Sequence, residues 1–373
     1  MRTRLVIYDI DLPPFMENRA FDVELMRQYP GGSAGAALAE RLQTQGVKMQ
    51  TADVFLRDPD LSTRAVVYSN EVTRFSRTLI HDLGIPGAVC SSGESPIVAW
   101  RFYSDLPEIS TRYRNMRLFP GASERVAHST HFQPFYWPYD DLTPRDSPAW
   151  GSRRFLTLIN SNKRAFGWPS PFFNVRHPRH SARMLARAWA VNRARHGNDW
   201  LSTELYVDRL RAIRHFGAID GFDLYGRGWT DPTAGADGST RTAIGQSYRG
   251  EIPALDKLRV LQRYKFCLCF ENCSFPGYIT EKIFDCLVSG TIPIYLGAPD
   301  ISNYVPAGAF IDFRDFAGFA ELELHLRSMS NHDAEGYRET ARAFLRSADA
   351  EKFTEAHLVM EVERMLLDSL EDQ

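Results

Sequence analysis

Residues 264–282, YKFCLCFENCSFPGYITEK, show most clearly how this chain folds. The first seven residues are an apolar run with the character of a buried strand, and a helix is expected to begin near Thr280. Polar side chains gather between the two, with Glu271 and Asn272 directly after the strand and Tyr278 before the helix. A strand that leads through a polar turn into a helix is the repeating unit of a parallel sheet wrapped by helices.

The start of this helix predicts an anion site. Thr280 is a plausible N-cap, the amides of the first turn are unsatisfied, and Lys282 adds a positive charge to the helix dipole, as a diphosphate requires. The alternative is an ordinary capped surface helix with a solvated pair of Glu281 and Lys282.

Strand-like and helix-like segments alternate over the rest of the chain, so the predicted fold class is α/β. A stretch rich in proline and turn residues, 134–151, separates two alternating series. We therefore expect two Rossmann-like domains, 1–150 and 151–350, facing a cleft at the carboxyl ends of their strands. The remaining segment, 351–373, is amphipathic at helical spacing and is expected to pack back on the domains.

Composition excludes several classes of protein. The 373 residues include 46 acidic and 44 basic ones, so the net charge of −2 gives no indication of nucleic-acid binding. No apolar run reaches the ~20 residues of a membrane span, so a soluble protein without a transmembrane segment is expected. The five cysteines are an odd number, which favours a reducing compartment, the cytoplasm. Four of them lie in residues 267–286, and their spacing favours buried apolar cysteines over a zinc site.

Residues 264–316 resemble a known family. The order FEN, YITEK and then GTIPIYLGAPDISNYVPAGAFIDFRDF is similar to the donor-site signature of the α-1,3/1,4-fucosyltransferases, glycosyltransferase family 10. The resemblance implies a GT-B fold whose C-terminal domain holds GDP-fucose. It also implies donor-binding roles for the matched polar residues Asn272, Tyr278, Glu281 and Lys282.

A second, weaker match lies in the first domain. CSSGESPIV, residues 90–98, resembles the family segment that carries Glu-Ser-Pro, and it makes Glu94 the candidate base for the acceptor hydroxyl. The implied reaction is inverting transfer of fucose to a glycan acceptor. Lys282 and the helix amides would neutralise the leaving diphosphate, so neither a metal nor another cofactor is expected.

One part of the family pattern is missing. Family members carry a diphosphate-binding arginine just before the helix that corresponds to residues 205–216, where this chain has Thr203. The favoured replacement is Lys163, next to Arg164 at the end of the strand predicted over residues 154–162, and Arg209 is the alternative. The basic insertion 176–195 has no counterpart in the family pattern and is expected to be a solvated helical excursion.

The sequence is also compatible with other functions. Asp9 and Asp11 follow an apolar strand, as in haloacid dehalogenase-type phosphatases and metal-dependent GT-A transferases, although Leu-Pro-Pro follows them instead of a polar turn. A catalytically silent binder of nucleotide sugars or glycans is a further alternative. The glycine-rich segment 29–38 is expected to start a helix and to line the acceptor side. Trp100, Phe102, Tyr103 and the aromatic run 132–139 are candidates for stacking on acceptor sugars.

Overall fold

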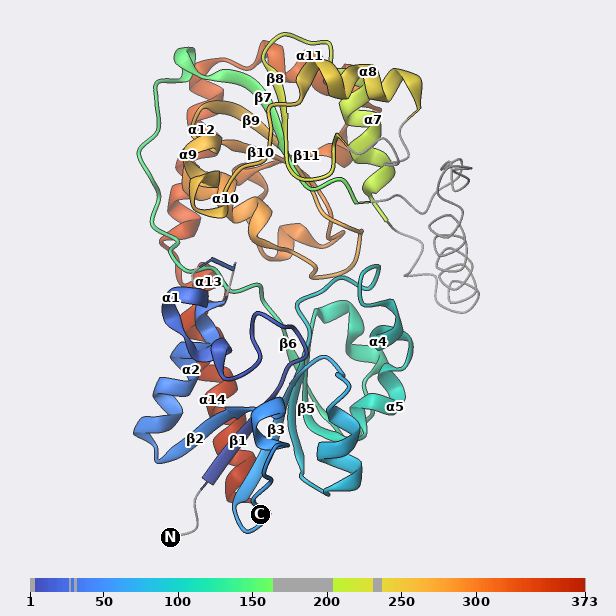
Figure 1. Cartoon of the computed structure of the whole chain (residues 1–373). Helices are drawn as coiled ribbons and strands as arrows, with labels where there is room; N and C mark the ends of the chain where they lie inside the picture. Colours follow the sequence, from blue (N-terminus) through green and yellow to red (C-terminus); the bar gives the residue numbers. More distant parts are fainter. Residues whose placement is uncertain (1–3, 27, 30–31, 164–203, 231–236, 373) are drawn as a thin grey trace. The chain divides into compact units, whose positions relative to one another are not determined.

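The computed structural model describes residues 4–26, 28–29, 32–163, 204–230 and 237–372 (Figure 1). It contains two compact units. The first consists of residues 1–94, 98–141 and 351–373, and the second of residues 95–97 and 142–350. Arg164, Thr203 and the basic insertion 176–195 lie outside the described residues.

The first unit is built on a six-stranded sheet in which every pairing is parallel. Its strand order is β2-β1-β3-β4-β5-β6. Its central strands are almost continuously apolar and buried, because helices cover both faces of a parallel sheet. The strands are β1 (Arg4–Asp9), β2 (Val47–Thr51), β3 (Arg64–Asn70), β4 (Gly87–Ser91), β5 (Tyr113–Leu118) and β6 (His131–Pro134). The α-helices are α1 (Val23–Met26), α2 (Ser33–Thr44), α3 (Ala52–Phe55), α4 (Trp100–Ser104), α5 (Leu106–Ser110) and α14 (Glu355–Glu371).

The second unit contains a five-stranded sheet, again parallel throughout, in the order β11-β10-β9-β7-β8. Its strands are β7 (Arg154–Ile159), β8 (Phe222–Tyr225), β9 (Tyr264–Phe270), β10 (Ile292–Leu296) and β11 (Ile311–Asp312). Its α-helices are α7 (Tyr206–Phe216), α8 (Gly238–Ser247), α9 (Lys257–Leu261), α10 (Glu281–Ser289), α11 (Phe319–Ser328), α12 (Asn331–Leu345) and α13 (Ala348–Glu351).

Each sheet has one topological switch point. In the first unit it lies between β1 and β3, because β2 pairs with one side of β1 and β3 with the other. In the second unit it lies between β7 and β9, because β8 pairs with one side of β7 and β9 with the other. Open α/β sheets bind their ligands outside the carboxyl ends of the strands at such a point. The topology therefore marks the residues after β1, β3, β7 and β9 as candidates for function.

The C-terminal helix α14 belongs to the first unit, although its sequence follows the second. It packs on α2, β3 and β4, and Leu358, Val362 and Leu366 on it are buried. The units divide between Asp141 and Leu142. The sequence predicts this boundary nine residues later, after residue 150. Residues up to Asp141 stay with the first unit because Tyr139 donates its N–H to the carbonyl of Phe353, which precedes α14.

Two local features are irregular or capped. A π-helical turn, Arg77–Asp82, lies between β3 and β4. Helix α8 is capped at its start, where the Asp237 carboxylate accepts the N–H of Thr240 at 2.8 Å. Among the helices of the described ranges, none is long and apolar enough to cross a bilayer.

Candidate functional site

A buried carboxylate organises the switch point of the second unit. Glu271, which follows β9, is fully buried and accepts the N–H and the hydroxyl of Thr280, each at 2.9 Å. Its other oxygen accepts a hydrogen bond from the Lys282 ammonium group, also at 2.9 Å. The sequence predicts that Thr280 caps α10, but its side chain makes no capping hydrogen bond to the helix. Glu271 instead fixes Thr280 from the end of the strand, so one carboxylate ties β9 to the start of α10.

The charges around the first turn of α10 are balanced. Lys282 lies 2.9 Å from Glu271 and 3.7 Å from Glu281, and Lys257 lies 2.5 Å from Asp285. Burial opposes the charge of Lys282, but the two glutamates raise its pKa above the usual value. Burial likewise opposes the charge of Glu281, yet Lys282 and Lys257 lower its pKa to about 2. Lys282 is therefore a charged member of an ion-pair network that includes Glu271 and Glu281.

Arg209 on α7 joins this network from the neighbouring side of the sheet. Its buried guanidinium donates to the Phe270 carbonyl at 2.6 Å and to Asn272 Oδ1 at 3.1 Å. Asn272 in turn donates from Nδ2 to the hydroxyl of Tyr278 at 3.1 Å. The Nε of Arg209 has no hydrogen-bond partner among the described residues. The structure thus brings Asn272, Tyr278, Glu281 and Lys282 together and adds Arg209, which the sequence offered only as an alternative.

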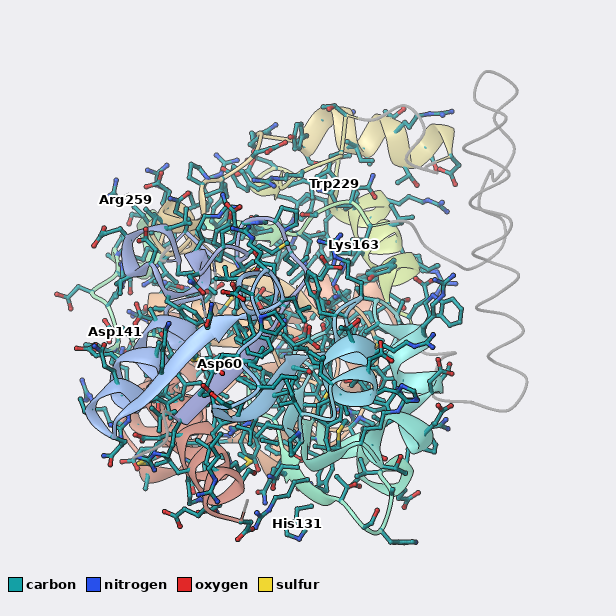
Figure 2. The ribbon with its side chains drawn as sticks, turned by 60° about the horizontal axis from the view of Figure 1, so that its bottom comes forward. Asp60, His131, Asp141, Lys163, Trp229 and Arg259 are labelled. Carbon is teal, nitrogen blue, oxygen red and sulfur yellow. The ribbon has the colours of Figure 1, made fainter. Side chains whose placement is uncertain are left out.

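Lys163, the favoured second cation, lies elsewhere in the second unit. Lys163, labelled in Figure 2, is exposed just beyond β7. The residues before it pair with the loop that follows β8. Asn162 donates its N–H to Arg227 at 2.8 Å, and the indole of Trp229 donates to Asn160 at 2.7 Å. Arg209 is the cation hydrogen-bonded to Asn272, and its position on the first turn of α7 depends on packing that single-sequence patterns do not reveal.

Glu94 lies in the first unit, on the turn after β4. Its N–H donates to the Ser92 hydroxyl at 3.2 Å, and its carbonyl accepts from the Tyr103 hydroxyl at 3.1 Å. The side chain is exposed and lines a cavity of about 290 Å³ at the carboxyl ends of β1, β3 and β4. This cavity therefore occupies the switch point of the first sheet. Glu94 is also the last residue of the first unit before residues 95–97, which pack within the second.

Aromatic and small residues form much of the wall of this cavity. Phe135 and Trp137 line it, whereas Phe102 and Tyr103 are buried core residues. Helix α2 begins at Ser33, within the glycine-rich segment, as the sequence predicts. Gly32 and Gly35 line the cavity. A Cβ on Gly32 would lie 2.5 Å from the Met26 carbonyl oxygen, so only glycine fits this close approach.

The pair Asp9 and Asp11 is used structurally. Asp9 is fully buried, and both of its carboxylate oxygens accept hydrogen bonds from hydroxyls, those of Ser69, Thr73 and Ser76. Burial raises the pKa of Asp9. Asp11 forms an ion pair with Arg74 at 3.2 Å. Since both oxygens of Asp9 are occupied, the arrangement does not support a phosphatase nucleophile or a metal ligand there.

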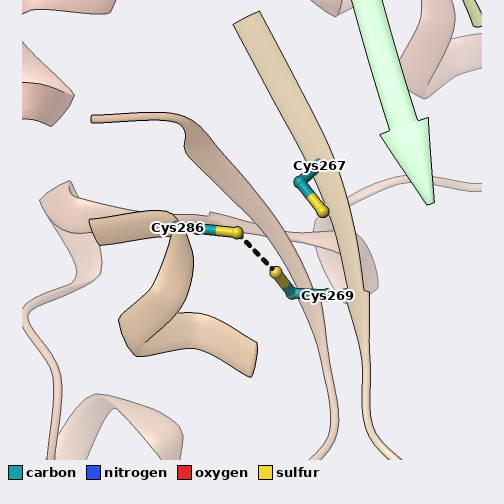
Figure 3. A group of neighbouring side chains, drawn as sticks. All are labelled: Cys267, Cys269 and Cys286. Carbon is teal, nitrogen blue, oxygen red and sulfur yellow. Dashed lines mark hydrogen bonds between the residues drawn. The ribbon is translucent and has the colours of Figure 1, made fainter. Parts of the chain in front are cut away.

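Three cysteines cluster beneath α10 (Figure 3). The sulfurs of Cys267, Cys269 and Cys286 all lie within 4.8 Å of one another, and Cys269 and Cys286 are 3.2 Å apart. The group includes no fourth histidine, cysteine or carboxylate among the described residues, whereas structural zinc sites have four ligands. All five cysteines are buried free thiols, which agrees with the prediction of small apolar core residues.

Part of this chain is similar to a known protein family. Residues 200–343 match the model described as "Glycosyltransferase family 10 (fucosyltransferase) C-term". The alpha-(1,3)-fucosyltransferase FucT of Helicobacter pylori is 36% identical over 102 residues, which is 27% of this chain and 20% of that protein. The alpha-(1,3)-fucosyltransferase 4 of mouse is 44% identical over 79 residues, 20% of this chain and 18% of that protein. The matched region thus spans about a fifth of the length of these relatives.

Solved structures share the fold over nearly the whole chain. A crystal structure of an alpha1,3-fucosyltransferase covers 98% of this chain and 90% of its own, with a TM-score of 0.51 and 14% identity. Anabaena Alr3699/HepE in complex with UDP and glucose covers 98% of this chain and all of its own, with a TM-score of 0.57 and 10% identity. The fold is therefore the α/β fold of GT-B glycosyltransferases, as predicted. Residues 200–343 are similar to the C-terminal domain of glycosyltransferase family 10, the fucosyltransferases.

Proposed function

We propose that this protein transfers fucose from GDP-fucose to a hydroxyl of a glycan acceptor, with inversion at the anomeric carbon. The observation that carries the proposal is the network of Glu271, Asn272, Tyr278 and Lys282 at the switch point of the second sheet. It lies inside the region that matches the fucosyltransferase family model. The relatives named above are fucosyltransferases, which supports the same sugar here.

The donor is assigned to the second unit. Lys282 and the first turn of α10 follow β9, at the strand end where the topology expects a ligand, and Arg209 supplies the second cation. Asn272, Tyr278 and Glu281 provide directional partners for ribose or fucose hydroxyls. Because Glu271 and Glu281 already balance Lys282, its ammonium group is held in place before the donor arrives. Such preorganisation stabilises the charge that develops on the leaving diphosphate.

The acceptor is assigned to the cavity of the first unit, with Glu94 as the general base. In the reaction the Glu94 carboxylate takes the proton of the acceptor hydroxyl, whose oxygen forms a bond to the anomeric carbon. The bond from that carbon to the diphosphate oxygen breaks, and its electron pair leaves with GDP. We propose that no metal ion takes part, with Lys282, Arg209 and the first-turn amides of α10 as the hydrogen-bond donors to the diphosphate. The five buried free thiols support a reducing compartment such as the cytoplasm.

The test measures transfer from GDP-fucose to a panel of oligosaccharides, together with GDP binding. Glu94→Gln keeps the size of the side chain but cannot accept the proton, so turnover should fall by about 10²- to 10⁴-fold with GDP affinity nearly unchanged. Glu124→Gln, on an exposed residue of the same unit, is the matched control and should retain full turnover.

Three results would contradict parts of the proposal. Near-normal turnover of Glu94→Gln would remove Glu94 as the base. Loss of turnover in EDTA, restored by magnesium or manganese, would show that a metal stabilises the leaving group. Thermal stabilisation by UDP-sugars equal to that by GDP-fucose would contradict the choice of donor.

A further inference from the structure

Glu71, the first residue after β3, has an unusual backbone. Its φ is 62°, and among the described non-glycine residues only Glu17, Asn18 and Glu71 have positive values. A glutamate in the left-handed region is less favourable than glycine, which adopts it freely. Residues held in such conformations concentrate at functional sites, where the side chain is needed in spite of the backbone.

The carboxylate of Glu71 is anchored at one oxygen only. Oε1 accepts the hydroxyl proton of Ser92 at 2.7 Å, and the same Ser92 hydroxyl accepts the N–H of Glu94. No described residue donates a hydrogen bond to Oε2. Burial raises the pKa of Glu71 above its usual value, the Ser92 hydrogen bond lowers it, and the nearby charge of Glu94 raises it further. The free oxygen therefore belongs to a partly desolvated carboxylate beside the candidate base.

The surroundings of Glu71 suit a sugar. Glu71 and Glu94 both line the 290 Å³ cavity, together with the aromatic rings of Phe135 and Trp137. Gly93 lies in the turn between Ser92 and Glu94. A Cβ on Gly93 would lie 3.3 Å from the ring of Phe135 and 3.4 Å from that of Trp137. The turn thus packs directly on the aromatic wall. Flat apolar rings beside hydrogen-bond acceptors match the two sides of a pyranose, its C–H face and its hydroxyl rim.

We propose that Glu71 is a specificity-determining residue for the acceptor: its free carboxylate oxygen accepts a hydrogen bond from a hydroxyl of the acceptor sugar, next to the hydroxyl that Glu94 deprotonates. The proposal rests on the proposed function. It deepens it by naming the acceptor as a sugar with two neighbouring hydroxyls directed at two carboxylates. Ser92 links the two residues, since its hydroxyl donates to the Glu71 carboxylate and accepts the backbone N–H of Glu94.

The experiment compares Glu71→Gly with Glu17→Gly. Both changes put glycine at a left-handed position, φ 62° and φ 59°, but Glu17 is exposed and lines a different hollow with its ion-pair partner Arg57. For Glu71→Gly we expect an unchanged or higher Tm, because glycine relieves the backbone. We expect the KM for the acceptor to rise about 10- to 100-fold, as for loss of a hydrogen bond to a charged group, with the KM for GDP-fucose unchanged. Glu17→Gly should leave both KM values unchanged.

Acceptor choice supplies a second readout. A deoxy acceptor that lacks the neighbouring hydroxyl should be a poor substrate for the wild type, while Glu71→Gly should treat it and the parent sugar nearly alike. An unchanged acceptor KM together with an unchanged preference between the two sugars would overturn the proposal. Saturation-transfer NMR with the same sugars needs no turnover, so it tests Glu71 even if the wild type transfers no fucose. Acceptor binding that weakens in Glu71→Gly while all variants lack transfer would refute the proposed function and support the Glu71 site.

Discussion

Glu271 accepts hydrogen bonds from the backbone and hydroxyl of Thr280 and from Lys282 while it is fully excluded from solvent. A buried carboxylate is tolerated only when its oxygens are satisfied, so each partner depends on the other. This reciprocal dependence gives Lys282 a structural role, as a hydrogen-bond partner of buried Glu271, beside the ligand-binding role proposed above. Gly297 is constrained by the same carboxylate, since a Cβ there would lie 2.6 Å from Glu271 Cγ.

We expect Lys282→Met to reduce both GDP affinity and stability. Removing one partner of a buried ion pair leaves the other uncompensated, which costs about 3–5 kcal/mol. The double variant Lys282→Met with Glu271→Gln should recover part of the stability, but not GDP binding. Urea unfolding and calorimetric titration with GDP measure the two effects. A single variant with wild-type stability would show that the Glu271–Lys282 pair is not coupled to folding.

The pKa of Glu281, lowered to about 2 from 4.5, makes the stability of the second unit pH-dependent. A carboxyl group with a depressed folded-state pKa stabilises the protein above pH ~4.5 and loses that contribution as the pH falls toward ~2. Glu281→Gln should therefore be less stable than the wild type by on the order of 3 kcal/mol at pH 7. The difference should shrink below pH ~4.5, as followed by urea unfolding. A constant difference from pH 7 to pH 3 would contradict the ion-pair assignment.

At the scale of elements, α14 is the clearest case of a segment that completes a unit distant in sequence. Its buried residues recur at helical spacing, so the sequence predicts one apolar face. The tertiary structure decides which surface the apolar face of α14 covers. That face packs on α2, β3 and β4 of the first unit. The helix is therefore part of the hydrophobic core of that unit.

Leu366→Ala and Met360→Ala test this packing within one helix. Leu366 is fully buried, so its truncation should destabilise the protein by about 2–5 kcal/mol. Met360 is 52% exposed, and its truncation should change stability by less than about 0.5 kcal/mol. Thermal unfolding followed by circular dichroism distinguishes the two. Equal effects of both substitutions would mean that α14 does not present the face assigned to it.

The thiol cluster between β9 and α10 predicts slow chemical modification. All five cysteines are buried, so a thiol reagent such as DTNB should react with them slowly in the native protein and with all five after unfolding. Saturating GDP should slow the native reaction of Cys286 further, because α10 carries both this thiol and Lys282. Rapid labelling of Cys269 or Cys286 in the native state would show that α10 opens readily.

On the scale of the whole molecule, each unit has its own parallel sheet, its own core and its own switch point. This duplication permits one ligand per unit, with the donor assigned to the residues after β9 and the acceptor to those after β3 and β4. The two assignments can be tested separately because each rests on residues of a single unit.

Hydrogen exchange provides that separation. GDP should slow amide exchange in β9 and in α10 of the second unit, because a ligand of the folded state suppresses local opening where it binds. An acceptor oligosaccharide should instead protect the turn 91–94 of the first unit. Protection by GDP confined to the first unit would reverse the assignment of the two substrates.

The sequence by itself determined the local features of this protein. Short apolar runs alternate along the chain with segments of helical periodicity, and this alternation predicts parallel sheets. The motifs FEN and YITEK predict that Asn272, Tyr278, Glu281 and Lys282 lie near the end of one strand. Such features depend on neighbours within about ten residues. They can be read without knowing what packs against them.

Only the tertiary structure decided which distant groups meet. Arg209, 63 residues before Asn272, reaches it because α7 packs beside β9, whereas Asn160 and Asn162, which precede Lys163, are hydrogen-bonded to the loop after β8. Glu71 and Glu94 are linked through Ser92 because β3 and β4 are neighbours in the sheet. Burial and charge compensation are sums over all surrounding elements, so the ionisation of Glu281 and the balanced charge of Lys282 depend on packing that no local pattern contains.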